Sequence, residues 1–106
     1  MTEMPTAFDG QELSLEFAQR AARGLVQLED MLAAATPASL AEFRREAHSL
    51  KGNAQVYGLT DFANLCHGLE DALPDGTDWT KPSETQAAMY LAHMDVVLRR
   101  LEAGLA

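Results

Sequence analysis

The chain has 106 residues, of which 47% are hydrophobic and 23% are charged, and its 16 acidic and 8 basic residues give a formal net charge of −8. This length suits a single domain, and the hydrophobic fraction is typical of a folded protein rather than a disordered one. The excess of acidic residues argues against nucleic acid or an anionic membrane as the main partner, because both would repel the chain.

The first residues, 1–8, are predicted to be a short tail ahead of one folded domain at residues 9–106. The tail contains Pro5 and lacks the basic and apolar stretches of a secretion signal. No apolar run in the chain approaches the roughly 18 residues needed to span a bilayer. The single cysteine, Cys66, excludes an internal disulfide and a zinc site of several cysteines. We therefore expect a cytoplasmic protein that is not bound to a membrane.

Four segments show the periodicity of amphipathic helices, with apolar residues at spacings of three and four. The first runs from about Asp9 to Ala35, contains no proline, and is rich in Ala, Leu, Glu and Gln, which favour helix. The dipeptide Thr36-Pro37 is predicted to end it. Its apolar stripe is Phe17, Ala21, Leu25, Leu28 and Leu32.

The second segment begins after this proline. Ser39 is predicted to cap the helix, and Glu42, three positions on, to complete a capping box. The helix is expected to end near Tyr57-Gly58, because glycine readily adopts the left-handed conformation that closes helices. Its apolar stripe is Leu40, Phe43, Ala47, Leu50 and Ala54.

The third segment has Thr60 as its predicted cap and ends before Pro74-Asp75-Gly76, a strong turn signal. Its apolar stripe is Phe62, Leu65, Cys66, Leu69 and Leu73. The residues up to Pro82 are predicted to form a loop, with Trp79 folded onto the helices. The fourth segment opens at Ser83-Glu84. Its apolar stripe is Ala87, Leu91, Met94, Leu98, Leu101 and Leu105.

These four helices, joined by short connections, predict an all-α fold. No stretch of useful length alternates between polar and apolar residues, as a strand would. The expected architecture is an antiparallel up-down four-helix bundle, and we expect the isolated domain to be a monomer.

The natural candidates for chemistry are the three histidines, His48, His67 and His93. His48 follows the core residue Ala47 by one position, which turns it about 100° from the apolar stripe onto the flank of the second helix. The same flank carries Arg44, Lys51 and Gln55. Gly52 lies one turn after His48, and a glycine there costs roughly 1 kcal/mol relative to alanine. Either it clears the approach of another protein to the imidazole, or it marks a flexible point or tight packing against a neighbour.

His67 and Glu70 share one face of the third helix. If the second and third helices form a hairpin, His48 and Glu70 lie at similar heights, because each is about ten residues from the turn. Glu70 would then accept a hydrogen bond from one imidazole nitrogen of His48 and leave the other nitrogen as a nucleophile. The alternatives are a plain polar bridge between helices and a metal site. No metal is predicted, because di-iron bundles carry the Glu-x-x-His pattern twice.

Other chemistries find no support in the sequence. The chain has no Gly-rich phosphate loop, so it is expected to bind neither ATP nor any other cofactor of its own. It lacks a serine nucleophile elbow and a credible Cys-His signature. Cys66 falls on the core stripe and is predicted to be a small buried hydrophobic residue, and His93 to lie at the surface or its boundary.

Three short runs stand out in the second and third segments: Ala47-His48-Ser49-Leu50-Lys51-Gly52-Asn53-Ala54, Tyr57-Gly58-Leu59 and His67-Gly68-Leu69-Glu70. Together they resemble the histidine-containing phosphotransfer (HPt) family. The combination looks most like the N-terminal phosphotransfer domain of the chemotaxis histidine kinase CheA. The resemblance covers about residues 9–105 and implies a four-helix relay module of two-component signalling.

The resemblance also implies a role for each of five residues. His48 would be phosphorylated on Nε2, Glu70 would hold Nδ1 by a hydrogen bond, and Lys51 would offer positive charge to the phosphoryl oxygens. His67 would complete the polar cluster, and Gly52 would clear the approach of a partner. A kinase catalytic domain, with its ATP and Mg²⁺, would supply the phosphoryl group, and an aspartate of a response-regulator receiver domain would accept it.

The resemblance leaves open whether the chain is part of a chemotaxis histidine kinase, and so of an enzyme, or a relay outside chemotaxis, either as a separate protein or as part of a hybrid kinase. A second hypothesis is a helical interaction module that passes no phosphate. A third is a metal-binding bundle, which predicts stoichiometric metal in the purified protein.

Overall fold

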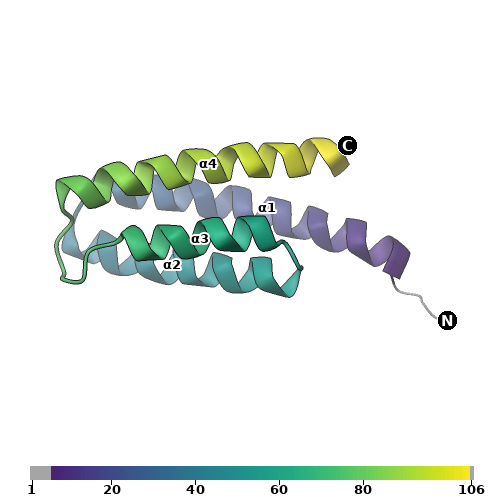
Figure 1. Ribbon diagram of the computed structural model, residues 1–106, viewed down its shortest axis with the longest axis horizontal. Helices are drawn as coiled ribbons and strands as arrows, with labels where there is room; N and C mark the ends of the chain where they lie inside the picture. The colour runs from purple at the N-terminus through teal and green to yellow at the C-terminus, as the bar shows by residue number, and fades with distance from the viewer. Residues whose placement is uncertain (1–5, 106) are drawn as a thin grey trace.

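The computed structural model describes the backbone of residues 6–105 and the side chains of residues 15–104. This part of the chain forms four α-helices and no strand: α1 (Thr6–Ala34), α2 (Pro37–Val56), α3 (Thr60–Ala72) and α4 (Lys81–Leu105). Figure 1 shows the α1–α2 and α3–α4 connections at one end of the molecule and the α2–α3 connection at the other. Each helix packs against the next in sequence, and α4 packs against α1 to close the bundle. The predicted antiparallel four-helix bundle is confirmed.

The core consists largely of the predicted apolar stripes. Phe17 of α1 packs edge-on against Tyr57 and Phe62, with ring centroids 5.6 and 5.2 Å apart. Fully burying a side chain of this size stabilises the fold by about 1.5–3 kcal/mol. The predicted core residues with no exposed surface are Phe17, Ala21, Leu28, Leu40, Phe43, Ala47, Leu50, Ala54, Cys66, Leu69, Ala87 and Met94. Four others are only half-buried, namely Leu32, Leu65, Leu73 and Leu101. The side chain of Leu105 lies outside the described residues.

Helix α1 begins at Thr6, three residues before the predicted start at Asp9, because no proline interrupts this stretch. Residues 6–8 of the predicted tail therefore belong to α1, and residues 1–5 lie outside the described part of the chain. At its other end, α1 stops at Ala34, close to the predicted boundary. Ala35 follows with a φ of 53°, in the left-handed region, and its N–H donates to the Met31 carbonyl at 3.1 Å.

The start of α2 corrects one prediction. The capping residue is Thr36 rather than Ser39, and Pro37 is the first helical residue. The Ser39 N–H donates to Thr36 Oγ1 and the Thr36 N–H donates to Ser39 Oγ, both at 3.0 Å. Proline suits this position because its fixed φ matches the helix and its missing N–H would have had no helical partner. Ser39 therefore closes a capping box that Thr36 opens, and Glu42 takes no part in it.

Two more helix starts differ from the prediction. The cap of α3 is Leu59, which makes no side-chain capping bond, so Thr60 is the first helical residue and not the cap. Helix α4 begins at Lys81, and Pro82 belongs to its first turn rather than to the loop. The N–H groups of Thr80 and Ser83 each donate to the other's side-chain oxygen, at 2.9 and 3.1 Å, which again places proline just inside a capping box.

The α2–α3 connection is as predicted. Gly58 has a φ of 72°, which is the left-handed conformation that favours glycine. It lets the chain reverse within Tyr57–Leu59, so that α2 and α3 run side by side. None of the described helices is long and apolar enough to cross a membrane.

Candidate functional site

His48 stands on the solvent-facing side of α2, directly after the buried Ala47. Its side chain is 74% exposed, and its Nδ1 lies 3.0 Å from Oε2 of Glu70 on α3. The α2–α3 hairpin therefore brings together two residues that are 22 positions apart. The contact predicted from their equal distances to the turn is confirmed.

Lys51, one turn after His48, holds the other side of the same carboxylate. Its Nζ lies 2.6 Å from Oε1 of Glu70, and only 20% of its side chain is exposed. The two Glu70 oxygens are thus divided, one to the imidazole and one to the ammonium group. Because each oxygen has its own partner, the two contacts together fix the orientation of the carboxylate.

These contacts determine the protonation state of Glu70. Partial burial alone would raise the pKa of its carboxyl, but the hydrogen bonds from Lys51 and His48, and the charges of both, outweigh burial and hold the pKa below the ordinary value of 4.5. An ionised carboxylate can only accept hydrogen bonds, so the proton of the contact belongs to Nδ1 of His48. In the neutral ring, Nε2 then carries a lone pair, and the largely exposed imidazole presents it to other molecules.

His67 does not join this group. Its Nε2 lies 3.4 Å from Oδ2 of Asp71, one turn further along α3, and both side chains are mostly exposed. Among the described residues, no hydrogen bond or ion pair links His67 to His48, Lys51 or Glu70. The i, i+4 neighbour on the same helix is simply nearer than the site on the adjacent helix. The predicted polar cluster therefore contains three of its four proposed members.

Gly52 faces open space. A Cβ atom built on it would meet no atom within 4 Å, apart from its own helix backbone. Tight packing against a neighbouring helix, one of the two explanations offered by the sequence, is therefore wrong for this glycine. The helix surface beside His48 is left without a side chain at this point, as an approaching partner would require.

One residue near the site could not be found from the sequence. Arg20 of α1 donates from Nη1 to Oε2 of Glu46 at 2.8 Å, and from Nη2 to Oγ of Ser49, the residue after His48, at 3.2 Å. Gly24 permits this close approach, because a Cβ there would lie 2.6 Å from Glu46 Oε2 and 2.9 Å from Arg20 Nη1. The pairing joins residues 26 and 29 positions apart, beyond any local pattern.

The family of this chain follows from a comparison with protein-family models. The model for the Hpt domain matches residues 12–105, nearly the whole chain. The chain belongs to the Hpt domain family. Searches of curated proteins and of solved structures found no match. Membership implies histidine phosphotransfer in two-component signalling, in which Hpt domains interact with kinase and receiver domains.

A second arginine of the Hpt domain, Arg44, holds the α3–α4 connection in place. Arg44 was predicted to share the flank of His48, and it donates from Nη2 to the carbonyls of Pro74 and Gly76, the latter at 2.9 Å. The α3–α4 connection is thereby tied to α2. Trp79 is folded onto the bundle, as predicted: its ring stands edge-on to Phe43, and its Nε1–H donates to Ser39 Oγ at 3.2 Å.

The remaining candidate residues lie apart from His48. Cys66 is buried in the core, and burial, reinforced by the nearby Glu70 charge, raises the pKa of its thiol to about 12, so it is an inert core residue. His93 is exposed on α4, where it borders a groove with Leu65 and Met89. Among the described residues, no group of three or more metal-ligating side chains is close enough to hold an ion.

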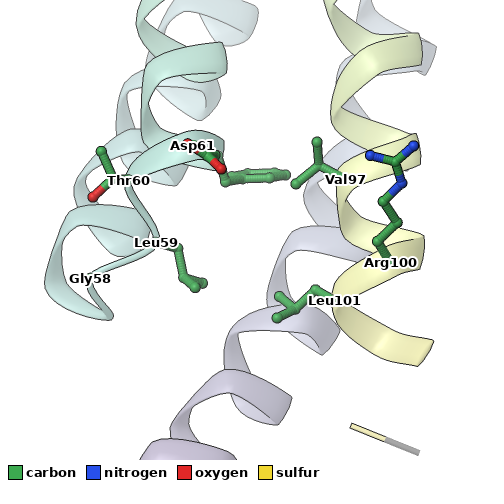
Figure 2. Close-up of a pocket in the computed structure, with 8 residues that line it drawn as sticks. Gly58, Leu59, Thr60, Asp61, Val97, Arg100 and Leu101 are labelled. Carbon is green, nitrogen blue, oxygen red and sulfur yellow. The ribbon is translucent and has the colours of Figure 1, made fainter. Parts of the chain in front are cut away.

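The Hpt domain also has a pocket of about 550 Å³ beyond the α2–α3 turn. Figure 2 shows Val97 and Leu101 of α4 pointing across it toward Leu59 and the start of α3, with Arg100 at its rim. No residue of the His48 site lines this pocket. His48 instead lies on an exposed side of α2, outside this pocket.

Proposed function

We propose that His48 is the phosphorylated residue of this Hpt domain. One observation carries the proposal: an imidazole that is 74% exposed has its Nδ1 3.0 Å from an ionised carboxylate, and no hydrogen bond among the described residues engages its Nε2. Hydrogen bonds to charged groups contribute about 1.5–3 kcal/mol, enough to favour one imidazole tautomer strongly. Among the described residues, neither of the other two histidines has this pairing with a carboxylate of a neighbouring helix.

In the proposed reaction, the Nε2 lone pair of His48 attacks the γ-phosphorus of ATP held by a kinase catalytic domain with Mg²⁺. The N–P bond forms as the bond to the bridging oxygen breaks, and ADP leaves with that electron pair. A carboxylate oxygen of the receiver aspartate then attacks the phosphorus. The N–P bond breaks, its electron pair returns to Nε2, and an acyl phosphate is formed on the receiver. Throughout both steps the proton stays on Nδ1 and remains hydrogen-bonded to Glu70.

Three other residues support this chemistry in the proposal. Glu70 orients the ring and offsets the positive charge that develops on it during attack. Lys51 holds Glu70 and brings an ammonium charge near the incoming phosphoryl oxygens, where electrostatics decides the rate of phosphoryl transfer. Gly52 leaves the room that a partner's backbone needs. We assign no such role to His67, which is paired with Asp71.

The pathway is proposed from the sequence resemblance to the phosphotransfer domain of the chemotaxis kinase CheA. The chain would act as a monomer that draws its phosphoryl group from a chemotaxis-type catalytic domain. A relay outside chemotaxis is the alternative, and it uses the same site chemistry. Encounters of this kind bury a small interface, below about 1,200 Å².

The test begins with the protein, ATP, Mg²⁺ and a chemotaxis-type kinase catalytic domain, followed by intact mass. We expect one acid-labile phosphoryl group, absent from the His48→Gln variant and passed on to a receiver domain. His93→Gln, which removes another exposed histidine, is the matched control and should be phosphorylated normally. Helical circular dichroism should show that His48→Gln keeps its fold. A phosphoryl group retained by folded His48→Gln would refute the assignment.

Lack of any adduct with several kinase catalytic domains has a different meaning. It would favour a helical interaction module that passes no phosphate. That alternative also predicts that partner binding is unaffected by His48→Gln.

A further inference from the structure

The outward face of α2 around His48 is formed by small, apolar and basic residues. Spacings of three and four place Ala41, Arg45, Ser49, Gly52 and Val56 in one row beside His48. Val56 is 81% exposed, and a side chain at Gly52 would meet no other part of the molecule. Another protein can therefore approach the helix backbone closely at Gly52.

Helix α2 differs in charge balance from the molecule as a whole. Helix α2 carries Arg44, Arg45 and Lys51 against Glu42 and Glu46, whereas the whole chain has twice as many acidic as basic residues. The Glu46 carboxylate is already engaged by Arg20 of α1. Glu70 of α3 likewise balances Lys51, so α2 contributes Arg44 and Arg45 against Glu42, a small basic excess in a protein of net charge −8.

Arg45 is the basic residue best placed to meet a partner. It is exposed, it lies one turn before His48 and Ser49, and no ion pair involves it among the described residues. By contrast, Lys51 is held by Glu70, and Arg44 is held by the carbonyls of the α3–α4 connection. The guanidinium of Arg45 therefore remains available for a carboxylate, which it can bind with two parallel hydrogen bonds.

Helix α1 extends the basic surface past the edge of α2. The close contact at Gly24 lets Arg20 reach Ser49 Oγ at 3.2 Å, so a second guanidinium lies at the border of the row. Arg23, three residues further along α1, is exposed on the same side of that helix. We call Arg20, Arg23 and Arg45 the basic edge; Arg20 is paired with Glu46, whereas no ion pair among the described residues involves Arg23 or Arg45.

We propose that this basic edge is the docking site for the acidic rim of a receiver domain, with Arg45 as its exposed anchor. The proposal rests on the proposed function, because the receiver must approach His48 to take its phosphoryl group. A receiver offers the complementary charge: its phosphoacceptor is a carboxylate, and the Mg²⁺ it uses is bound through carboxylates. Charge complementarity of this kind speeds association and sets partner choice more than it adds affinity.

The experiment separates docking from the chemistry of His48. The protein is phosphorylated directly with potassium phosphoramidate, a small donor that needs no docking surface. Transfer to receiver domains that accept its phosphoryl group is then followed over a range of salt concentrations. Arg45→Glu is compared with Arg100→Glu, which makes the same change in net charge on α4, away from His48.

We expect both variants to be phosphorylated by phosphoramidate at the rate of the unaltered protein. At low salt, transfer from Arg45→Glu should be slower by roughly ten-fold or more, and the deficit should shrink as salt rises, since electrostatic steering changes association rates by factors of about 10 to 1,000. Arg100→Glu should transfer normally. Equal transfer by the two variants, with phosphorylation intact, overturns the docking proposal alone. Failure of phosphoramidate to modify His48 in the unaltered protein overturns the proposed function and the docking proposal with it.

Discussion

Glu70 links two functional groups of α2, the imidazole of His48 and the ammonium group of Lys51. Its carboxylate accepts from His48 with one oxygen and from Lys51 with the other, at 3.0 and 2.6 Å. A single side chain on α3 therefore determines both the tautomer of the imidazole and the position of the ammonium group. Because the pair of contacts also lowers the pKa of Glu70, the site contributes to stability only while that carboxyl is ionised.

This gives a pH dependence with a definite sign. The folded-state pKa of Glu70 lies below its ordinary 4.5, so its contribution to stability is complete above that pH and is lost as the pH falls through the lower folded value. The free energy of unfolding of the protein should therefore exceed that of Glu70→Gln most at neutral pH. The difference should narrow on acidification below about pH 4.5. Urea titrations followed by circular dichroism at several pH values measure it.

Asp71→Asn is the control for this measurement, because it removes a neighbouring but exposed carboxylate from the same helix and makes the same change in net charge. A second readout concerns the tautomer. Nitrogen NMR of the His48 ring should show the proton on Nδ1 in the protein and a mixture of tautomers in Glu70→Gln. A stability difference that grows on acidification, or an unchanged tautomer, contradicts the role given to Glu70.

At the scale of the helix, two glycines with the same intrinsic cost have opposite surroundings. Gly52 of α2 faces open space, whereas a Cβ on Gly68 of α3 would lie 2.6 Å from Cε1 and 2.7 Å from Oη of Tyr90 on α4. Gly52→Ala should stabilise the protein by about 0.5–1 kcal/mol, the ordinary preference for alanine in a helix. Gly68→Ala gains the same preference but forces Tyr90 from its place, and overpacking of this kind costs roughly 1–3 kcal/mol. Urea denaturation of the two variants measures the difference.

The two variants are each other's control, since the substitution is identical and both sites are helical. If Gly68→Ala proves as stable as Gly52→Ala, the α3–α4 packing at Tyr90 is looser than the structure shows. If Gly52→Ala is destabilising, another part of the chain packs against the surface at Gly52. Gly52 is then better explained as a packing residue than as part of a docking face.

Helices and core positions could be predicted because they depend on local periodicity, but the first residues of the helices could not. The stripe Phe43, Ala47, Leu50 is buried as expected, since one face of an amphipathic helix can point only inward. At the start of α2, however, both Thr36 and Ser39 are good capping residues. Thr36 is the capping residue because Pro37 fits the first turn of the helix. The start of α4 differs from the prediction for the same reason: Thr80 caps the helix, and Pro82 lies in its first turn.

The site divides in the same way. The contact of His48 with Glu70 follows from counting residues on either side of one tight turn, so hairpin geometry was sufficient to predict it. The Lys51–Glu70 pair lies in the same hairpin but does not follow from counting residues, because Lys51 is three positions nearer the turn than His48. Arg20 reaches Ser49 from another helix, where register depends on how Gly24 packs. Sequence spacing carries no information on that register.

On the scale of the whole molecule, α2 is tied by polar contacts to α1, to α3 and to the α3–α4 connection. Arg20 joins it to α1, Glu70 joins it to α3, and Arg44 joins it to the connection between α3 and α4. Trp79, the sole tryptophan, lies in that connection and packs on Phe43. Its fluorescence therefore reports whether the connection stays docked at the end of the bundle where α2 begins (Figure 1).

The neighbouring arginines of α2 should then separate architecture from recognition. Arg44→Gln loses the charged donor to the carbonyls of Pro74 and Gly76, and we expect it to lower the free energy of unfolding by about 1–3 kcal/mol and to make Trp79 more accessible to acrylamide quenching. Arg45→Gln removes an exposed arginine with no ion pair in the described part of the chain, so its stability should stay within about 0.5 kcal/mol. Its defect should instead appear in transfer to a receiver. If Arg44→Gln leaves Trp79 and stability unchanged, the connection is held by Phe43 and Ser39 alone, and the arginine is free to serve recognition as Arg45 does.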